Sequence, residues 1–200
     1  MGPHFSLLIL AAGRSKRMGT PKALLPFGTR RAIDLLVESA RQARLEPVLV
    51  VSSEDVLSCA QSLRAHAVWN PSPELGRTHS VQIGLSHIDR ERGCLIVPID
   101  APLISATTFT QIASADASWE IVRPRFAGRP GHPVRFGRAS LEEVTKLGPD
   151  EPLHLVVRRV PERVLNLDVG DEECIANLNT PADYEAALKR FRSRATGCAP

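Results

Sequence analysis

The segment from Leu8 to Leu25, LILAAGRSKRMGTPKALL, is the feature that most narrowly constrains the fold of this chain. It begins as an apolar run, breaks at Ala-Ala-Gly and continues as a loop rich in positive charge, and no Asp or Glu occurs before Asp34. The basic residues of this first part are Arg14, Lys16, Arg17, Lys22, Arg30 and Arg31. An apolar strand that leads into a basic glycine loop places backbone N–H groups and cations around a polyphosphate. We therefore expect this loop to hold a nucleoside triphosphate.

The composition is typical of a soluble globular protein, with 43% hydrophobic and 24% charged residues. A length of 200 residues allows one domain with a substantial core, and we predict a single domain over residues 1–192 followed by a C-terminal tail, 193–200. The net charge of +3 is too small for a general nucleic-acid binder. Because the positive charge gathers near the N-terminus, it indicates a small anionic ligand instead.

The cysteines and the first apolar run bear on localisation. Cys59, Cys94, Cys174 and Cys198 are widely spaced and form no CxxC pair, which argues against a zinc site or a redox motif and favours a reduced, cytoplasmic setting. The apolar run 6–12 is too short to cross a bilayer and lacks the basic leader of a signal peptide. We expect neither export nor membrane insertion.

Short apolar runs alternate with segments of helical spacing along the chain. Strands are predicted at 5–11, 47–51, 67–69, 94–99, 119–123, 132–136 and 164–167, with a tight turn at 128–131. Helices are predicted at 32–43, 54–66, 78–89, 140–147, 152–158 and 181–191, and another from Ser105 or Thr107 to Ala115. The strands show no polar–apolar alternation, which indicates a mainly parallel sheet, and the closely spaced strands after Ala117 indicate an antiparallel portion. The predicted fold is a three-layer α/β/α, Rossmann-like domain with a mixed, mostly parallel sheet.

Ligands of such sheets lie outside the carboxyl ends of the strands, which here are residues 12–13, 52–53, Asn70 and Asp100. The first of these ends has neither the dinucleotide fingerprint GxGxxG nor the phosphate loop GxxxxGK[ST]. Gly13 would let the backbone approach a ligand, and Arg17 and Lys22 would supply charge. A solvated basic loop is the competing interpretation, but the position directly after a strand favours a phosphate loop.

Two further stretches suggest a metal site. Asp100 ends a buried strand with a proline two residues on, and a carboxylate there is well placed to hold magnesium, although a turn or a helix cap would also account for it. Asn177 and Asn179 lie two residues apart, and one of them could offer its amide oxygen to the same metal. The simpler interpretation of this stretch is a helix start, which certainly holds for Thr180 and the proline after it. Asp168 and Asp171 are weaker alternatives.

The segment LAAGRSKRMGTPKALLPF strongly resembles the signature of the MobA-like nucleotidyltransferases, which include the molybdenum-cofactor cytidylyl- and guanylyltransferases. The resemblance implies the nucleotide-diphospho-sugar transferase fold and a triphosphate bound by Gly13, Arg17 and Lys22, with the loop residues Leu10, Ala11 and Ala12. The LAAG form and Pro21 are typical of the cytidylyl branch and favour CTP over GTP. The similarity of VPIDAPLI and NLNTP to family elements implies that Asp100 and either Asn177 or Asn179 hold Mg²⁺.

Two other stretches are similar to family elements in part. GRTHSVQIG resembles a segment that contacts base and ribose, with Ser80 as the best candidate, although Arg77 and His79 stand where the family has small residues. GHPV resembles an element of the acceptor side, which implies that His132 binds the acceptor. The flanking Arg129 and Arg135 could hold an acidic phosphate or dithiolene group.

The resemblance implies transfer of a nucleotidyl group from CTP, or less favourably GTP, to a phosphate-bearing acceptor, with release of pyrophosphate. Arg17, Lys22 and Asp100 would be the catalytic residues, and molybdopterin the acceptor. The partners are then a nucleoside triphosphate, a phosphorylated small molecule and a protein that receives the product cofactor, with no nucleic acid or membrane. Two alternatives remain open: a sugar- or alcohol-phosphate acceptor, and a non-catalytic nucleotide-binding accessory protein.

Overall fold

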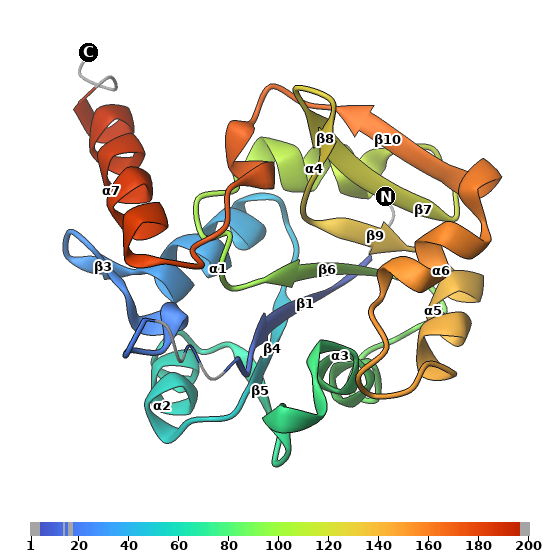
Figure 1. Cartoon of the computed structure of the whole chain (residues 1–200), viewed down its shortest axis with the longest axis horizontal. Coiled ribbons are helices and arrows are strands. Elements are labelled where there is room, and N and C mark those ends of the chain that lie inside the picture. The colour runs from blue at the N-terminus through green and yellow to red at the C-terminus, as the bar shows by residue number, and fades with distance from the viewer. Residues whose placement is uncertain (1–4, 14, 16–17, 197–200) are drawn as a thin grey trace.

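The computed structural model describes residues 5–13, 15 and 18–196, with side chains as far as residue 194. Its centre is an eight-stranded sheet in the order β10-β7-β9-β6-β1-β4-β5, with β8 paired to β7 (Figure 1). The strands are β1 (Ser6–Ala11), β4 (Pro47–Val51), β5 (His66–Trp69), β6 (Cys94–Pro98), β7 (Ile121–Phe126), β8 (Arg129–Pro130), β9 (Val134–Phe136) and β10 (Val164–Asp168). A separate hairpin joins β2 (Pro26–Phe27) to β3 (Arg30–Arg31).

The sheet is mostly parallel, as predicted, because β1 runs parallel to β4 and β6, β4 to β5, and β10 to β7. The predicted antiparallel portion is also present, since β9 lies antiparallel between β6 and β7. The carboxyl ends of β1, β4, β5 and β6 therefore lie along one edge, which is where parallel sheets of this kind bind their ligands.

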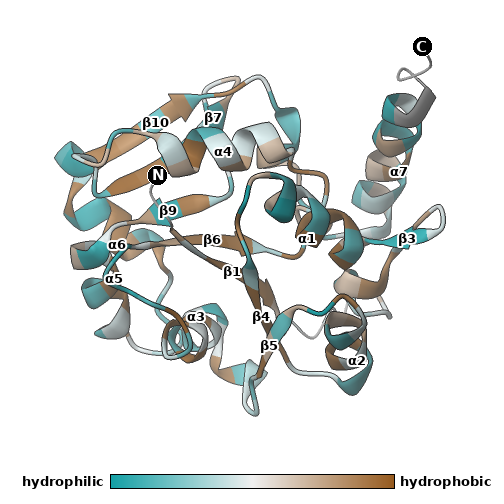
Figure 2. Cartoon of the chain, turned by 180° about the vertical axis from the view of Figure 1, so that it is seen from behind, coloured by the Kyte–Doolittle hydropathy of each residue, from teal (hydrophilic) through white to brown (hydrophobic). Residues whose placement is uncertain are grey.

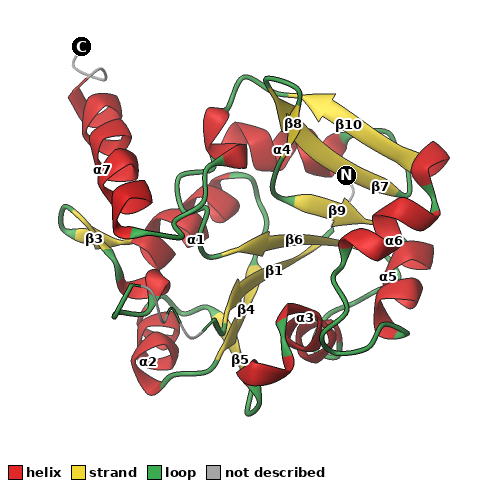
Figure 3. Ribbon diagram, in the orientation of Figure 1, coloured by secondary structure: helices red, strands yellow, loops and turns green. Residues whose placement is uncertain are grey.

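Helices cover both faces of the sheet (Figure 3). One face packs against α1 (Ala32–Gln42), α2 (Glu54–Ser62) and α4 (Ala106–Ser114). The other face packs against α3 (Arg77–Leu85), α5 (Arg138–Thr145) and α6 (His154–Arg159). Successive residues of β1 enter opposite cores, since Leu7 and Ile9 belong to the first and Leu8 and Leu10 to the second. The apolar strands lie between the two helix layers (Figure 2), and the predicted three-layer arrangement is confirmed.

A third apolar cluster joins the last helix, α7 (Pro181–Thr196), to the β2-β3 hairpin. The ring of Phe27 stands edge-on to the rings of Tyr184 and Phe191, with centroids 5.6 and 5.5 Å away. Short 3-10 turns complete the chain: η1 (Lys22–Leu24), η2 (Pro73–Leu75), η3 (Pro161–Arg163) and η4 (Glu172–Ile175). Throughout the described ranges, no helix is both long and apolar enough to cross a membrane.

Several predicted boundaries were wrong. The helix predicted to reach residue 66 ends at Ser62 because Arg64 has a left-handed backbone, with φ of 52°. The helix predicted over 78–89 spans Arg77–Leu85, and the strand predicted at 119–123 spans Ile121–Phe126. The predicted turn at 128–131 contains the short strand β8, and the chain reverses at residues 127 and 128, both with positive φ.

The last helix runs five residues beyond its predicted end, so the tail predicted from residue 193 begins inside α7. Its final turns are held by Glu173, which is 2% exposed and pairs with Arg190 at 2.8 Å and with Arg194 at 3.3 Å. The Arg194 guanidinium also donates to the Leu103 carbonyl. These long-range contacts are invisible to local helix signals, which explains the error.

Candidate functional site

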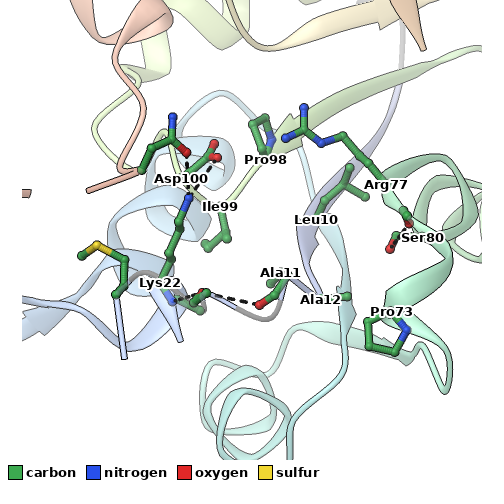
Figure 4. Close-up of a pocket in the computed structure, with 16 residues that line it drawn as sticks. Leu10, Ala11, Ala12, Lys22, Pro73, Arg77, Ser80, Pro98, Ile99 and Asp100 are labelled. Atoms are coloured by element: carbon green, nitrogen blue, oxygen red, sulfur yellow. Dashed lines mark hydrogen bonds and ion pairs between the residues drawn. The ribbon is translucent and has the colours of Figure 1, made fainter. Parts of the chain in front are cut away.

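A first cavity of about 370 Å³ opens at the carboxyl ends of β1 and β6 (Figure 4). It brings together the predicted nucleotide residues that the structure describes, which are Leu10, Ala11, Ala12, Gly13, Lys22 and Ser80. Two predicted metal ligands, Asp100 and Asn179, line the same cavity. Arg17, the remaining predicted nucleotide residue, lies outside the described residues. Segments some 160 residues apart in the sequence thus meet around one space.

The glycine loop is closed across its base by Ser15, which sequence reasoning missed. The Ser15 hydroxyl accepts a hydrogen bond from the Lys22 backbone N–H at 3.0 Å and lies 3.4 Å from the Gly13 carbonyl. Gly13 itself is exposed, and a Cβ at this position would meet open space. The space over Gly13 is thus left free for a ligand, and the loop is shaped by Ser15 and by the 3-10 turn that starts at Lys22.

Lys22 lies between the two predicted metal ligands. Its ammonium nitrogen is 3.0 Å from the Asn179 amide oxygen and 3.4 Å from Asp100 Oδ2. The backbone explains the meeting, because the Leu178 N–H donates to the Asp100 carbonyl at 2.7 Å and holds the 177–179 segment against the end of β6. The side chains of Lys22 and Asp100 are 16% and 12% exposed, so the pair is only partly screened by water.

Asp100 and Asn179 also fit a magnesium ion. Asp100 Oδ1 is buried and has no hydrogen-bond partner among the described residues, which leaves one carboxylate oxygen available for a cation. No three His, Cys, Asp or Glu residues gather into a metal cage within the described part of the chain. A site of one carboxylate and one amide suits Mg²⁺, which takes its other ligands from phosphates and water.

Asn177 and the two weaker alternatives are placed elsewhere. Asn177 lines a second cavity, whereas Asn179 lines the first one together with Asp100. Asp168 pairs with Arg125 at 2.6 Å, and Asp171 accepts hydrogen bonds from the Ser105 N–H and the Thr108 hydroxyl. Both carboxylates are therefore engaged in contacts with neighbouring segments, and neither lines the first cavity.

The opposite wall of the first cavity carries Ser80, whose hydroxyl is oriented by Asn70. The Asn70 amide oxygen accepts from the Ser72 N–H at 2.9 Å, and its NH₂ donates to Ser80 Oγ at 2.9 Å. Asn70 is fully buried, so this pair is well protected from water. The Ser80 hydroxyl proton is then left with only a long contact, 3.4 Å, to the Gly76 carbonyl. Ser80 thus offers a donor to a ligand.

A second cavity of about 480 Å³ adjoins the first and shares Leu10, Arg77 and Pro98 with it. The predicted acceptor residues His132 and Arg129 both line it. So do Arg123 and His154, which sequence reasoning missed because nothing near them in the sequence marks a site. Its apolar walls come from Ile96, Val134, Phe136, Leu153, Val157 and Ile175. The cavity thus combines apolar walls with cationic and imidazole groups.

His132 presents an unpaired polar atom to this second cavity. Its Nδ1 is buried and finds no partner in the described structure. Burial lowers the pKa of His132 to about 4, with Asp100 acting in the opposite direction and Arg77 lowering it further. The imidazole is therefore neutral at pH 7 and suits a hydrogen-bonding group of a ligand better than it suits a phosphate.

The suggested role of Arg135 in acceptor binding was wrong. Arg135 is 1% exposed, and its guanidinium donates to the carbonyls of Ala115, Asp116 and Trp119 at 2.7 to 3.1 Å. It also lies over the Phe5 ring, 4.9 Å from the centroid. Its neighbours Val134 and Phe136 line the cavity, and strand alternation turns Arg135 to the other face of the sheet, where it holds the end of α4.

Comparison with known proteins agrees with this geometry. Residues 7–164 match the family model described as the MobA-like NTP transferase domain. A probable molybdenum cofactor guanylyltransferase from Carboxydothermus hydrogenoformans is 27% identical and covers 94% of this chain and 97% of its own length. The molybdenum cofactor cytidylyltransferase of Escherichia coli is 25% identical, with 92% and 95% covered.

A solved structure shares the fold. A nucleotidyl transferase from Methanothermobacter superimposes with a TM-score of 0.84 at 22% identity, covering 96% of this chain and all of its own. The fold, the cavity at the strand ends and the family match over most of the chain lead to one assignment: the chain is a nucleotidyltransferase of the MobA-like NTP transferase domain family.

Proposed function

We propose that this protein transfers a nucleotidyl group from CTP to the phosphate of molybdopterin and releases pyrophosphate. The observation that carries the proposal is the pair of adjoining cavities. One holds Lys22 between Asp100 and Asn179 beside the glycine loop, and the other combines apolar walls with Arg129 and His132. Two cavities that share a wall suit a reaction that joins two substrates.

The chemistry asks little of the protein beyond position and charge. An oxygen of the acceptor phosphate attacks the α-phosphorus in line, a new P–O bond forms, and the bond to the β-phosphate breaks with its electron pair leaving on pyrophosphate. The acceptor phosphate is already a nucleophile, so no general base is needed. Lys22 neutralises charge on the leaving pyrophosphate, and the glycine loop binds the triphosphate through its backbone. We assign Arg17 the same charge-neutralising role.

The residues of the first cavity also suit Mg²⁺. Asp100, through its unpartnered Oδ1, and Asn179 would hold the ion. A bound Mg²⁺ supplies charge neutralisation on the phosphate oxygens. Lys22, which contacts both residues, lies beside the place where the phosphates would bind.

The base preference rests on Ser80. With its oxygen accepting from Asn70, Ser80 offers a donor, and the Watson–Crick edge of cytosine presents adjacent acceptors at O2 and N3. The corresponding edge of guanine presents N1–H and N2–H donors beside a single acceptor, O6. The LAAG form of the loop supports the same choice. Relatives named for either nucleotide exist, so the base must be tested directly.

The acceptor assignment rests on the character of the second cavity. A planar heterocycle with a phosphate needs apolar walls, a neutral hydrogen-bonding group and a cation, which Val134 and Phe136, His132 and Arg129 would provide. Two curated relatives that span nearly all of this chain are both named for the molybdenum cofactor.

The test has two steps. Thermal shifts with CTP, GTP, ATP and UTP in the presence of Mg²⁺ identify the nucleotide, since a ligand that binds the folded state raises the melting temperature. Pyrophosphate release is then measured with molybdopterin, a sugar phosphate and methylerythritol phosphate. We expect the largest shift with CTP and release with molybdopterin. Release only with another acceptor would overturn the acceptor assignment. Binding without release from any acceptor would indicate a non-catalytic nucleotide-binding protein.

A further inference from the structure

The boundary between the two cavities has a simple composition. Of the described residues, Leu10, Arg77 and Pro98 line both spaces, and Arg77 alone among these three carries a charge. In Figure 4 the Arg77 side chain extends from α3 past Leu10 toward Pro98. In a reaction between a ligand of one cavity and a ligand of the other, the reacting groups must meet at this boundary.

The backbone of Arg77 is held firmly. It is the first residue of α3 and follows Gly76, whose φ is 108° and where a Cβ would approach the Pro149 carbonyl oxygen to 2.9 Å. The His79 N–H donates to the same carbonyl at 3.2 Å, and the Thr78 hydroxyl donates to the Glu151 carbonyl. The first turn of α3 is thereby fixed against the 149–151 loop, so the position from which Arg77 reaches the boundary is defined.

The guanidinium itself is uncommitted. Arg77 is exposed, and across the described residues it forms neither an ion pair nor a hydrogen bond with another side chain. Of the other cations that line the two cavities, Lys22 contacts Asp100 and Asn179, and Arg123 donates to Asn166 at 2.6 Å. Arg129 resembles Arg77 in having no side-chain partner among the described residues, but it lines the second cavity and not the junction. Its charge nevertheless acts on the second cavity, because it lowers the pKa of His132.

We propose that Arg77 is a catalytic residue that binds the reacting phosphates at the junction of the two cavities. This inference rests on the proposed nucleotidyl transfer. When an acceptor phosphate attacks the α-phosphorus, charge is spread over the equatorial oxygens of that phosphorus. A guanidinium can donate to two such oxygens at once, and it stabilises the transition state without taking up or releasing a proton.

The experiment compares Arg77→Ala and Arg77→Lys with the unaltered protein in pyrophosphate release, with kcat and both KM values measured separately. Arg90→Ala removes an exposed arginine that lines neither cavity and is the matched control. We expect Arg77→Ala to lower kcat about 100-fold and to change each KM less than about 3-fold, as for loss of one donor to the transition state. Arg77→Lys should recover about 10-fold, and Arg90→Ala should match the unaltered protein. Melting temperatures check that each variant is folded.

A binding measurement supplies a second readout. A nucleoside diphosphate ester with the preferred base places its diphosphate across the junction, and calorimetry should find it bound about 10-fold more weakly by Arg77→Ala. An unchanged kcat together with unchanged ester affinity would overturn the role of Arg77, as would an effect confined to one substrate's KM. If the unaltered protein neither transfers a nucleotide nor binds the ester, the proposed function fails and this inference with it. The two failures are thus distinguishable.

Discussion

The two cavities are built in different ways from the same sheet edge. In the first, half of the lining comes from the continuous stretch 10–23, and Lys22 contacts both the Asp100 carboxylate and the neutral Asn179 amide. In the second, the lining comes from β1, β6, β7, β8, β9, α3, α6, the 131–132 loop and the segments around residues 150 and 175. His132 Nδ1 has no hydrogen-bond partner among the described residues. The first cavity is a preorganised charge site. The second is a cavity with apolar walls, in which His132 Nδ1 is available to a ligand.

The difference suggests a division of labour. A preorganised charge site stabilises developing charge at no reorganisation cost, which suits the part of the reaction common to all nucleoside triphosphates. A cavity with apolar walls and few polar groups, such as the second one, selects a ligand by shape and by hydrogen bonding. Substitutions in the first cavity should therefore reduce turnover. Substitutions in or beside the second cavity should change the affinity for the acceptor or only the stability of the fold.

The largest expected effect is on the charge site. Lys22→Ala and Asp100→Ala should each reduce turnover at least about 100-fold at saturating substrates, the scale of losing one charge-stabilising group. The measurement is pyrophosphate release at fixed nucleotide and acceptor concentrations. Lys146→Ala is the matched control, because Lys146 is an exposed lysine on the surface of the α5 region and pairs with Glu143 at 2.6 Å. Near-normal turnover in either variant would remove that residue from the catalytic site.

The second effect separates two arginines that flank the same short sequence. Arg135→Met should lower the free energy of unfolding by about 2 kcal/mol, because three carbonyls of the 115–119 segment lose hydrogen bonds to a charged, buried donor. Arg129→Ala removes an exposed arginine of the second cavity, so it should leave stability unchanged and raise the KM of the acceptor. Urea unfolding measures the first effect and steady-state kinetics the second. If an Arg135 variant had normal stability and an altered acceptor KM, Arg135 would bind the acceptor and its structural role would be wrong.

These arginines show how far the sequence could predict the site. The apolar runs predict nearly every strand, and because Lys22 and Asp100 follow or end such runs, their meeting could be predicted from sheet geometry alone. Asn70 could be found the same way, since it follows the end of β5. Arg135 was misplaced because proximity in sequence to His132 was preferred to strand alternation, which sends neighbouring residues to opposite faces.

Other features could not be predicted from local patterns. The end of α7 depends on Glu173, and the second cavity depends on residues such as Arg123 and His154 that carry no motif. Both arise from contacts between segments distant in sequence, which neither helix propensity nor spacing records. The uncommitted Arg77 was visible in the sequence only as a departure from the family pattern, and its place at the junction emerged from the packing of α3 on the 149–151 loop.

The smallest expected effect concerns His132 and the second cavity alone. Its pKa of about 4 in the folded chain lies below the ordinary value of 6.5, chiefly because of burial. Above pH 6.5 the imidazole is neutral in both states and contributes nothing to the pH dependence of stability. Between pH 6.5 and 4 the imidazole is protonated in the unfolded chain but not in the folded chain. As the pH falls through this range, His132 therefore lowers the free energy of unfolding by roughly 1 kcal/mol per pH unit. Below pH 4 both states are protonated and the dependence ends.

Two measurements check this prediction. In an NMR titration the His132 ring should remain neutral at pH 5.5. Urea unfolding of His132→Asn should lose less stability than the unaltered protein as the pH falls from 6.5 to 5.5, since asparagine does not titrate. A His132 ring that titrates near 6.5 would mean that its nitrogen reaches water. The second cavity would then be a solvated pocket suited to a phosphate, and the contrast with the charge site around Lys22 would disappear.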